Sequence, residues 1–154
     1  MVGTKIDARA FSQVPVRTFE CKLKKVLVPR NYFINNSLGI DVRYLDQPGQ
    51  NQIYVGDWDG TFKMAWTDNP AWILYDIITD YNYGLGNYID LSSVDKWTLY
   101  EIGRYCDAVE DTGKFRGVPD GKGGLEPRYT CNVIFYNKDE AYNVLKDIAA
   151  IFKG

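Results

Sequence analysis

The acidic pair around Trp58 is the first place in the chain where side chains could bind a metal ion. Asp57 and Asp59 lie two residues apart and are followed by Gly60, an arrangement that can begin a calcium loop. Calcium takes about six to eight oxygen ligands, and the further acidic residues and closing Glu of an EF-hand loop are missing. Because Asp and Gly favour turns, we predict that Asp57-Trp58-Asp59-Gly60 is a turn joining two strands.

A glycine-rich stretch, residues 117–124 (GVPDGKGG), is the next candidate, since such loops can cradle a phosphate. The spacing before the Gly-Lys pair is one residue short of the nucleotide-binding motif. Gly123 also stands where that motif has a Ser or Thr hydroxyl. We predict instead a flexible connector, running from Thr112 to Glu126, that becomes ordered against a partner.

Two carboxylates, Asp76 and Asp80, share one face of a predicted helix. Paired acids can hydrolyse glycosides when they lie across a cleft. On one helix, however, we expect a solvated face, or one acid capping a neighbouring segment. The chain contains no His, so no imidazole can activate a Ser or Cys nucleophile. We therefore predict that the protein is not an enzyme, with no catalytic, cofactor-binding or metal-binding residues and no cofactor.

Aromatic residues make up 15% of the chain, and several are close together in the sequence. Surface Trp rings can stack on sugars, so Trp58, Phe62, Trp66 and Trp72 could form a platform. This is the basis of an alternative function, a carbohydrate-binding module contacting a cell-surface glycan. Trp72 lies one step from the apolar stripe of a predicted helix, which favours a core or subunit-interface position for it.

The formal net charge of −2 gives no electrostatic argument for binding nucleic acid or an acidic membrane. A short basic cluster lies in a predicted strand and is interpreted as a solvated strand face: Lys22, Lys24 and Lys25. The cysteines are widely spaced, form no CxxC pair, and are predicted to be buried free thiols that fold in a reducing compartment: Cys21, Cys106 and Cys131.

Residues 1–65 are predicted to be a β-rich N-terminal part. Apolar residues alternate at Phe19, Cys21 and Leu23, and the alternation continues on the other parity at Val26 and Val28. The change of parity at Lys24-Lys25 predicts a β-bulge or a twist of the strand. Pro29 should end the strand or place it at a sheet edge. The stretch from Phe33 to Gln52 carries turn residues around an apolar patch at 40–45 and is interpreted as a hairpin-like excursion leading to 53–55.

Residues 66–154 are predicted to form a helix-helix-strand-helix unit. Asn69 is a good N-cap and Pro70 suits the first helical position, while Gly84 and Gly86 should stop this helix. Its apolar stripe is expected at Ala71, Leu74, Tyr75 and Ile78. A second helix should begin at Ser92 or Ser93, with Asp95 in its first turn and a stripe at Leu99, Ile102, Cys106 and Val109.

The last part of the unit is predicted from a change in periodicity. Residues 128–136 alternate as a strand, with Tyr129, Cys131, Val133 and Phe135 on one side. A third helix should follow Asn137, with a buried stripe at Ala141, Val144 or Leu145, Ile148 and Phe152. The predicted fold class is α+β, with three helices packed on a small sheet. The chain ends on a natural helix C-cap, which suits an internal fragment of a longer protein.

Several ordered blocks of this sequence resemble the tail-tip host-specificity proteins (protein J) of lambda-like phages. The most specific is residues 60–86, GTFKMAWTDNPAWILYDIITDYNYGLG. It is followed by SSVDKWTLYEIGRYCD and by GGLEPRYTCNVIFYNKDEAYNVLKDIAAIFKG, and preceded by IDARAFSQVPVRTFECKLKKVLVPRNY and YVGDWDGTF. The resemblance covers nearly the whole chain and departs from the family mainly between Phe33 and Gln52.

The resemblance implies a structural role in a phage or prophage tail-tip hub used in host attachment and DNA delivery. It implies that this chain is an internal piece of a much longer hub protein that forms a homotrimer and meets other tail-tip and tail-tube proteins. The resemblance further implies that the full-length protein contacts a host outer-membrane receptor through a region far downstream. The implied location is the virion tail tip, with assembly in the bacterial cytoplasm. We expect residues 33–52 and 112–126 to meet neighbouring subunits, and we expect no nucleic-acid binding.

Overall fold

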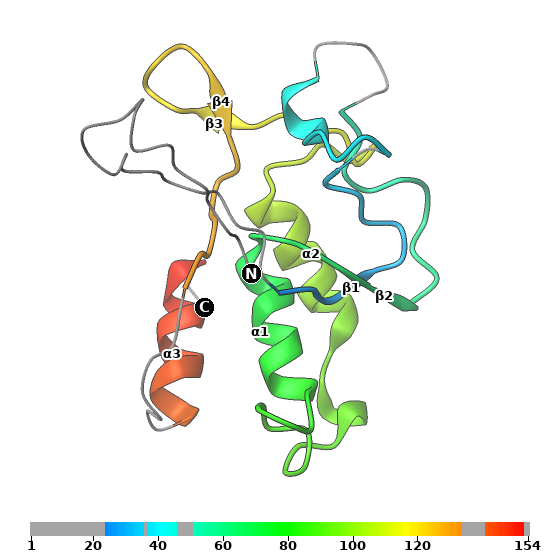
Figure 1. The fold of residues 1–154 in the computed structure, drawn as a ribbon, viewed down its shortest axis with the longest axis vertical. Helices are drawn as coiled ribbons and strands as arrows, with labels where there is room; N and C mark the ends of the chain where they lie inside the picture. The colour runs from blue at the N-terminus through cyan, green and yellow to red at the C-terminus, as the bar shows by residue number, and fades with distance from the viewer. Residues whose placement is uncertain (1–23, 36, 46–50, 134–140, 153–154) are drawn as a thin grey trace, which may run out of the picture.

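Helix α1 (Pro70–Thr79) lies at the centre of the computed structural model, which describes residues 24–35, 37–45, 51–133 and 141–152. As predicted, Asn69 caps the helix by accepting a hydrogen bond from the Ala71 N–H, and Pro70 occupies the first turn. Strand β1 (Val26–Pro29) and helices α2 (Lys96–Cys106) and α3 (Ala141–Ile151) all contact α1 (Figure 1). The α+β fold class with three helices is confirmed.

The first sheet consists of β1 paired antiparallel with β2 (Phe62–Ala65). The register pairs Val26 with Ala65 and Pro29 with Phe62, so β1 ends at the proline as predicted. The alternation at Phe19, Cys21 and Leu23 lies outside the described residues. The sheet is small, and α1 packs against it through β1. Helices α2 and α3 pack on α1 itself.

The predicted connector at 112–126 is only partly a loop. It contains a second antiparallel pair, β3 (Val118–Pro119) with β4 (Leu125–Glu126). Before it, Phe115 is buried, and the carbonyl of Gly113 accepts hydrogen bonds from the N–H groups of both Ile53 and Tyr54. The first part of this segment is therefore ordered by the chain's own core. The prediction of a flexible connector is wrong there.

Helix α2 begins later than predicted. Ser92 and Ser93 belong to a 3₁₀ turn, η2 (Leu91–Ser93), and the N-cap of α2 is Asp95, which accepts hydrogen bonds from the Trp97 and Thr98 N–H groups. The helix ends at Cys106, because Ala108 adopts a left-handed φ of 52°. Val109, expected in the apolar stripe, therefore lies beyond the helix. Helix α1 likewise already ends at Thr79, before Gly84 and Gly86.

Residues 128–133 do not form the predicted strand, and residues 134–136 lie outside the described part. The Tyr129 N–H donates to the Cys106 carbonyl and the Cys131 N–H donates to the Asp68 carbonyl. The segment thus bonds to the ends of two separate elements instead of to a neighbouring strand. The third helix is confirmed as α3, where Ile148 is buried at the predicted stripe position.

The excursion at 33–52 forms a 3₁₀ turn, η1 (Val42–Tyr44), in place of a hairpin with regular strands. Isolated bridges join Tyr32 to Tyr54 and Asn35 to Asp41. Ile34 and Val42 from this excursion belong to the main core. At least this part of the excursion therefore packs inward, and residues 36 and 46–50 are not described.

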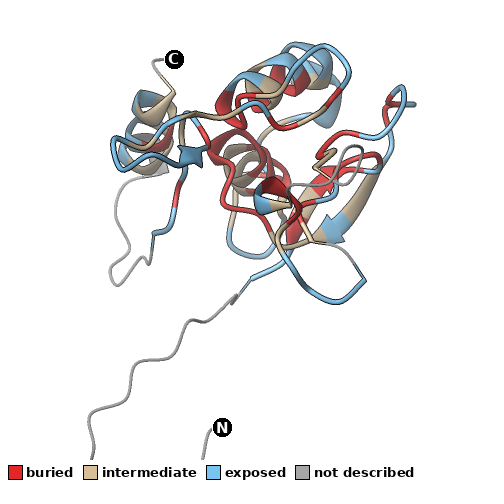
Figure 2. Ribbon diagram, turned by 90° about the horizontal axis from the view of Figure 1, so that it is seen from above, coloured by how far each residue is buried: buried red, intermediate tan, exposed pale blue. Residues whose placement is uncertain are grey.

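The core is built from aromatic rings around Trp72, whose side chain is fully buried. Trp58 stacks on Tyr100 with ring centroids 4.8 Å apart, and Phe62 stacks on Tyr75 at 4.5 Å. Tyr54 meets Tyr100 edge to face at 5.3 Å. Figure 2 shows the buried residues gathered inside an exposed shell. Residues from both predicted parts, 1–65 and 66–154, contribute to this one cluster, and the division between them stays a prediction.

Among the described residues, no helix has the length and apolar character needed to cross a membrane.

Gly103 tests how tightly α2 packs on Trp72. A Cβ atom at this position would lie 2.7 Å from Cζ2 of the Trp72 indole, a contact that forces the ring or the helix to shift. We expect Gly103→Ala to lower the free energy of unfolding by about 1–3 kcal/mol, measured by urea titration. The matched control is Glu101→Ala on the exposed face of the same helix, which should stay within about 0.5 kcal/mol of wild type. Equal stability of the two variants would contradict this packing.

Candidate functional site

The predicted turn at residues 57–60 leads into β2, but among the described residues no regular strand comes directly before it, since Gln52 and Tyr54 form only isolated bridges. Asp59 Oδ1 accepts hydrogen bonds from the Thr61 N–H at 2.9 Å and the Thr61 hydroxyl at 2.5 Å, and Gly60 has a φ of 80° that favours glycine. The Trp58 indole N–H donates to the Thr61 carbonyl at 2.6 Å, which holds this ring against the core. The Asp59 carboxylate therefore stabilises the turn.

In the glycine-rich loop, a carboxylate of the chain itself binds the backbone N–H groups. Asp120 Oδ1 accepts hydrogen bonds from the N–H groups of Lys122 at 2.7 Å and Gly124 at 2.9 Å. These backbone donors are the kind that a phosphate-binding loop would offer to its ligand. Because the Asp120 carboxylate occupies them, this hairpin tip is a closed turn.

Asp76 and Asp80 have separate roles. Asp80 accepts hydrogen bonds from the Asn82 and Tyr83 N–H groups and so caps the segment after α1. Asp76 is 5% exposed, accepts hydrogen bonds from the Leu27 N–H and the Tyr83 hydroxyl, and lies 3.8 Å from the Lys24 ammonium. The solvated-face alternative is therefore wrong for Asp76, whose carboxylate satisfies the edge of β1. The other alternative, one acid capping a neighbouring segment, describes Asp80.

The aromatic set does not form a surface platform. Trp72 is fully buried, Trp58 is 8% exposed, and Phe62 and Trp66 are half-buried. Rings that fill a core cannot stack on a sugar, so the sequence basis for the carbohydrate-binding alternative is lost at Trp58 and Trp72. Cys106 and Cys131 are buried free thiols as predicted, and burial raises the pKa of Cys106 to about 12. Cys21 and Lys22 lie outside the described residues.

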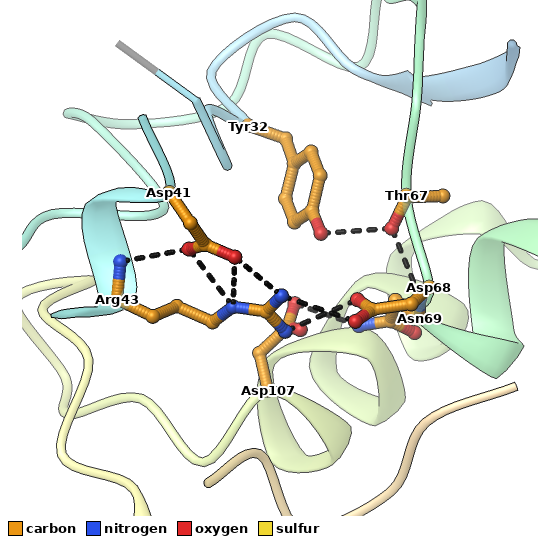
Figure 3. Close-up of polar contacts among 7 residues, drawn as sticks. All are labelled: Tyr32, Asp41, Arg43, Thr67, Asp68, Asn69 and Asp107. Atoms are coloured by element: carbon orange, nitrogen blue, oxygen red, sulfur yellow. Dashed lines mark hydrogen bonds and ion pairs between the residues drawn. The ribbon is translucent and has the colours of Figure 1, made fainter. Parts of the chain in front are cut away.

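The main polar site is one that the sequence did not predict, a buried network around Arg43 (Figure 3). Arg43 Nη1 and Nη2 donate to the two oxygens of Asp68 at 3.1 Å and 3.0 Å. On the other side, Arg43 Nε and Nη2 donate to Asp41 at 3.0 Å and 2.7 Å. The Arg43 side chain is 4% exposed. One guanidinium thus binds two carboxylates in the fork geometry that Arg favours.

Arg43 stays protonated in the folded protein. Burial alone would lower the pKa of this guanidinium, but the Asp41 and Asp68 carboxylates outweigh it, so the pKa lies above its usual value. A turn in the excursion, η1, is thereby tied to the residue immediately before the N-cap of α1. Asn69, that N-cap, links the network to Asp107 by donating from Nδ2 to Asp107 Oδ2 at 2.6 Å and to the Gly103 carbonyl at 2.8 Å.

Asp107 is a carboxylate in the interior at the C-terminal end of α2. Its Oδ2 accepts a second hydrogen bond from the Tyr54 hydroxyl at 2.8 Å, while Oδ1 is buried without a partner. Burial raises the pKa of Asp107 to about 7, and the Asp68 charge adds to that rise. The hydrogen bonds from Tyr54 and Asn69 and the charge of Arg43 oppose it. Asp107 is therefore a titratable group near neutral pH.

This network connects parts of the chain that are far apart in the sequence, and its chemistry is structural. Its donors are directed at acceptors of the same network, and Asp107 Oδ1 is the buried acceptor without a partner. Within the described ranges, no three acidic or cysteine side chains gather in a way that could hold a metal ion. The predicted lack of catalytic, cofactor-binding and metal-binding residues stays a prediction. A signal for Arg43 existed in the sequence, because it is the single basic residue inside the apolar patch 40–45.

Comparison with known proteins places the sequence among phage tail proteins, although no protein-family model matches it. The chain is 42% identical over 155 residues to "Tip attachment protein J" of Escherichia phage SECphi27. It is 39% identical over 154 residues to the protein of the same name from Escherichia phage SECphi4. Both alignments cover 100% of the chain but only 11% and 12% of those proteins. The chain thus spans a small part of the length of its curated relatives.

Removing the cation at the centre of the network should be strongly destabilising. In Arg43→Met, the buried Asp68 carboxylate loses its partner, so we expect a loss of about 3–5 kcal/mol in the free energy of unfolding, measured by urea titration. Arg43→Met combined with Asp68→Leu should recover part of this loss, since no buried charge is then left unpaired. If Arg43→Met is as stable as wild type, the ion pair contributes nothing.

Asp107 should make stability depend on pH. Its pKa is raised in the folded state, so its contribution is fully present below the unfolded pKa and is lost as pH rises to about 7. Wild type should therefore lose up to about 1.4 kcal/mol per pH unit relative to Asp107→Asn over that window. Asn keeps an acceptor for Tyr54 and Asn69 but carries no charge. Urea titrations of both proteins at several pH values test this; parallel pH profiles would contradict it.

Proposed function

This chain belongs to the tip attachment protein J family over the segment that it shares with those proteins, and on that premise we propose that it is a structural component of a phage tail tip. The observation that carries the proposal is the alignment of the whole chain at 42% and 39% identity with two attachment proteins. Such identity along the full chain supports a shared fold and a shared place in the larger protein.

The physical character of the described residues supports a role in holding shape. The interior is filled by stacked aromatic rings around Trp72 and by charged side chains that bind one another around Arg43. Both are suited to fixing the relative positions of short elements. The candidate sites found in the sequence are occupied by the chain's own groups, which supports a non-enzymatic role.

The proposed partners follow from that role. We propose that the full-length protein is a homotrimer at the virion tail tip, that it meets other tail-tip and tail-tube proteins, and that a separate region of it contacts a host outer-membrane receptor. Assembly is proposed to take place in the cytoplasm of the bacterial host. In this arrangement, this chain contributes a folded unit whose exposed loops meet its neighbours.

Segment exchange in a phage tests the proposal. In Escherichia phage SECphi27, the stretch of the attachment protein that matches this chain is replaced by this chain, and plaque titre and tail morphology are measured. We expect particles with normal tail tips. The same exchange carrying Trp72→Ala should yield few such particles, because losing a buried Trp costs about 3–5 kcal/mol of stability.

The exchange carrying Glu101→Ala, an exposed position on α2, is the matched control and should assemble like the unmodified exchange. The proposal is overturned if deleting the whole stretch leaves tail tips and plaque titre unchanged.

A further inference from the structure

The tyrosine loop, defined here as residues 80–91, leads from the end of α1 to η2. It lies at the end of the molecule remote from the β3–β4 hairpin (Figure 1). Loops of this kind are usually polar, but this one exposes large side chains to solvent. The most exposed are Tyr88 at 85%, Tyr81 at 58% and Tyr83 at 51%. Tyrosines are enriched among the residues that anchor protein interfaces.

The loop is held in shape by its own hydrogen bonds. The Asn87 side chain donates to the Tyr81 carbonyl at 2.7 Å, and the Tyr88 N–H donates to the Leu85 carbonyl at 2.8 Å. The Leu85 N–H donates at 2.9 Å to the Ile77 carbonyl of α1, which attaches the loop to the helix. Gly84 permits this close approach, since a Cβ there would lie 2.1 Å from the Ile77 oxygen. A preorganised loop loses little conformational entropy on binding.

The charged residues of the loop itself are of one sign, and the cation that contacts it, Lys24, comes from elsewhere in the chain. Between Met64 and Asp95, the sequence contains no Lys or Arg, whereas Asp80 and Asp90 lie within the loop and Asp95 follows it. A surface of this charge repels phosphate-bearing partners such as nucleic acid or anionic lipid. It attracts cations, and tyrosine rings bind ammonium and guanidinium groups on their faces.

The structure contains an example of this recognition within the loop, at Tyr83. The Lys24 ammonium lies 3.1 Å from the centroid of the Tyr83 ring and 3.8 Å from Asp76 Oδ2. One lysine of the chain thus already binds a tyrosine face and a carboxylate together. Across the part of the chain that the structure describes, no Lys or Arg of the chain lies over the rings of Tyr81 or Tyr88.

We propose that the tyrosine loop is a docking surface for a segment of another tail protein that carries lysine or arginine side chains. The cations of this segment stack on Tyr81 and Tyr88, and Asp90 supplies the opposite charge. The inference rests on the proposed function, since it gives the chemistry of one partner of that structural role. Binding by the purified chain tests it separately from particle assembly.

The probe is a fluorescein-labelled octalysine peptide titrated with the purified chain, with fluorescence anisotropy as the readout. We expect saturable binding that weakens with salt and is absent for an octaglutamine peptide. Each exposed cation–π contact is worth about 0.5–1 kcal/mol, so Tyr81→Ala with Tyr88→Ala should weaken binding by about five- to thirtyfold. Tyr44→Ala is the matched control and should bind like wild type, because Tyr44 is 61% exposed but lies in η1, away from the loop (Figure 1).

Two conservative variants test the roles of the ring face and of the Asp90 charge even if the double variant is poorly folded. Tyr88→Phe keeps the ring face and should retain binding. Asp90→Asn keeps the N-cap of η2 but loses the charge, so it should bind more weakly. The proposal is overturned if the Tyr81 and Tyr88 changes weaken binding no more than Tyr44→Ala does. It is also overturned if ultracentrifugation shows self-association of the wild-type chain that only the loop variants lose, because the occupant would then be a second copy.

Discussion

The burial of Arg43 between Asp41 and Asp68 is the constraint on which the arrangement of the other elements depends. A guanidinium taken out of water needs its donors satisfied, and the two carboxylates that satisfy them come from different parts of the chain. Asp68 is followed directly by Asn69, the N-cap of α1. Satisfying the charge therefore fixes where η1 lies relative to the start of the central helix.

The aromatic core and the polar network share residues and support each other. Trp72 donates from its indole nitrogen to the Tyr54 hydroxyl at 3.2 Å, and that hydroxyl donates in turn to Asp107. Tyr54 also packs edge to face on both Tyr32 and Tyr100. The position of a ring such as Tyr54 is thus fixed by hydrogen bonds as well as by packing. A core of this kind allows fewer alternative side-chain arrangements than an aliphatic core of the same volume.

Local signals in the sequence were enough to predict some elements. The Asn69-Pro70 pair identified the start of α1, because an N-cap followed by proline satisfies the first backbone donors by itself. The start of α2 differs from the prediction because Ser92 and Asp95 are both good caps, and Ser92 is taken up in a 3₁₀ turn that the Asp90 side chain caps. Alternation at 128–133 was misinterpreted as a strand because its backbone bonds go to Cys106 and Asp68, far away in the sequence.

Most of the polar site could not be predicted, since its pairs other than Arg43–Asp41 join segments separated by other elements. Arg43 in an apolar patch signals a partner but does not identify Asp68 as that partner. The residues next to Asp107 in the sequence do not signal its burial, which follows only from the contacts of Tyr54 and Asn69.

A buried ion pair is seldom the most stable solution for a core, because hydrophobic residues of similar volume often do as well or better. The ion pair instead disfavours alternative packings. Any packing that separates Arg43 from Asp68 leaves an unpaired charge in the interior. A component of an assembly benefits when only one packing of its elements is favourable. In the proposed role its loops meet neighbours at fixed positions, and the tyrosine loop is attached to the same α1 whose other end the ion pair holds. The network inside the molecule and the surface outside it are therefore connected through one short helix.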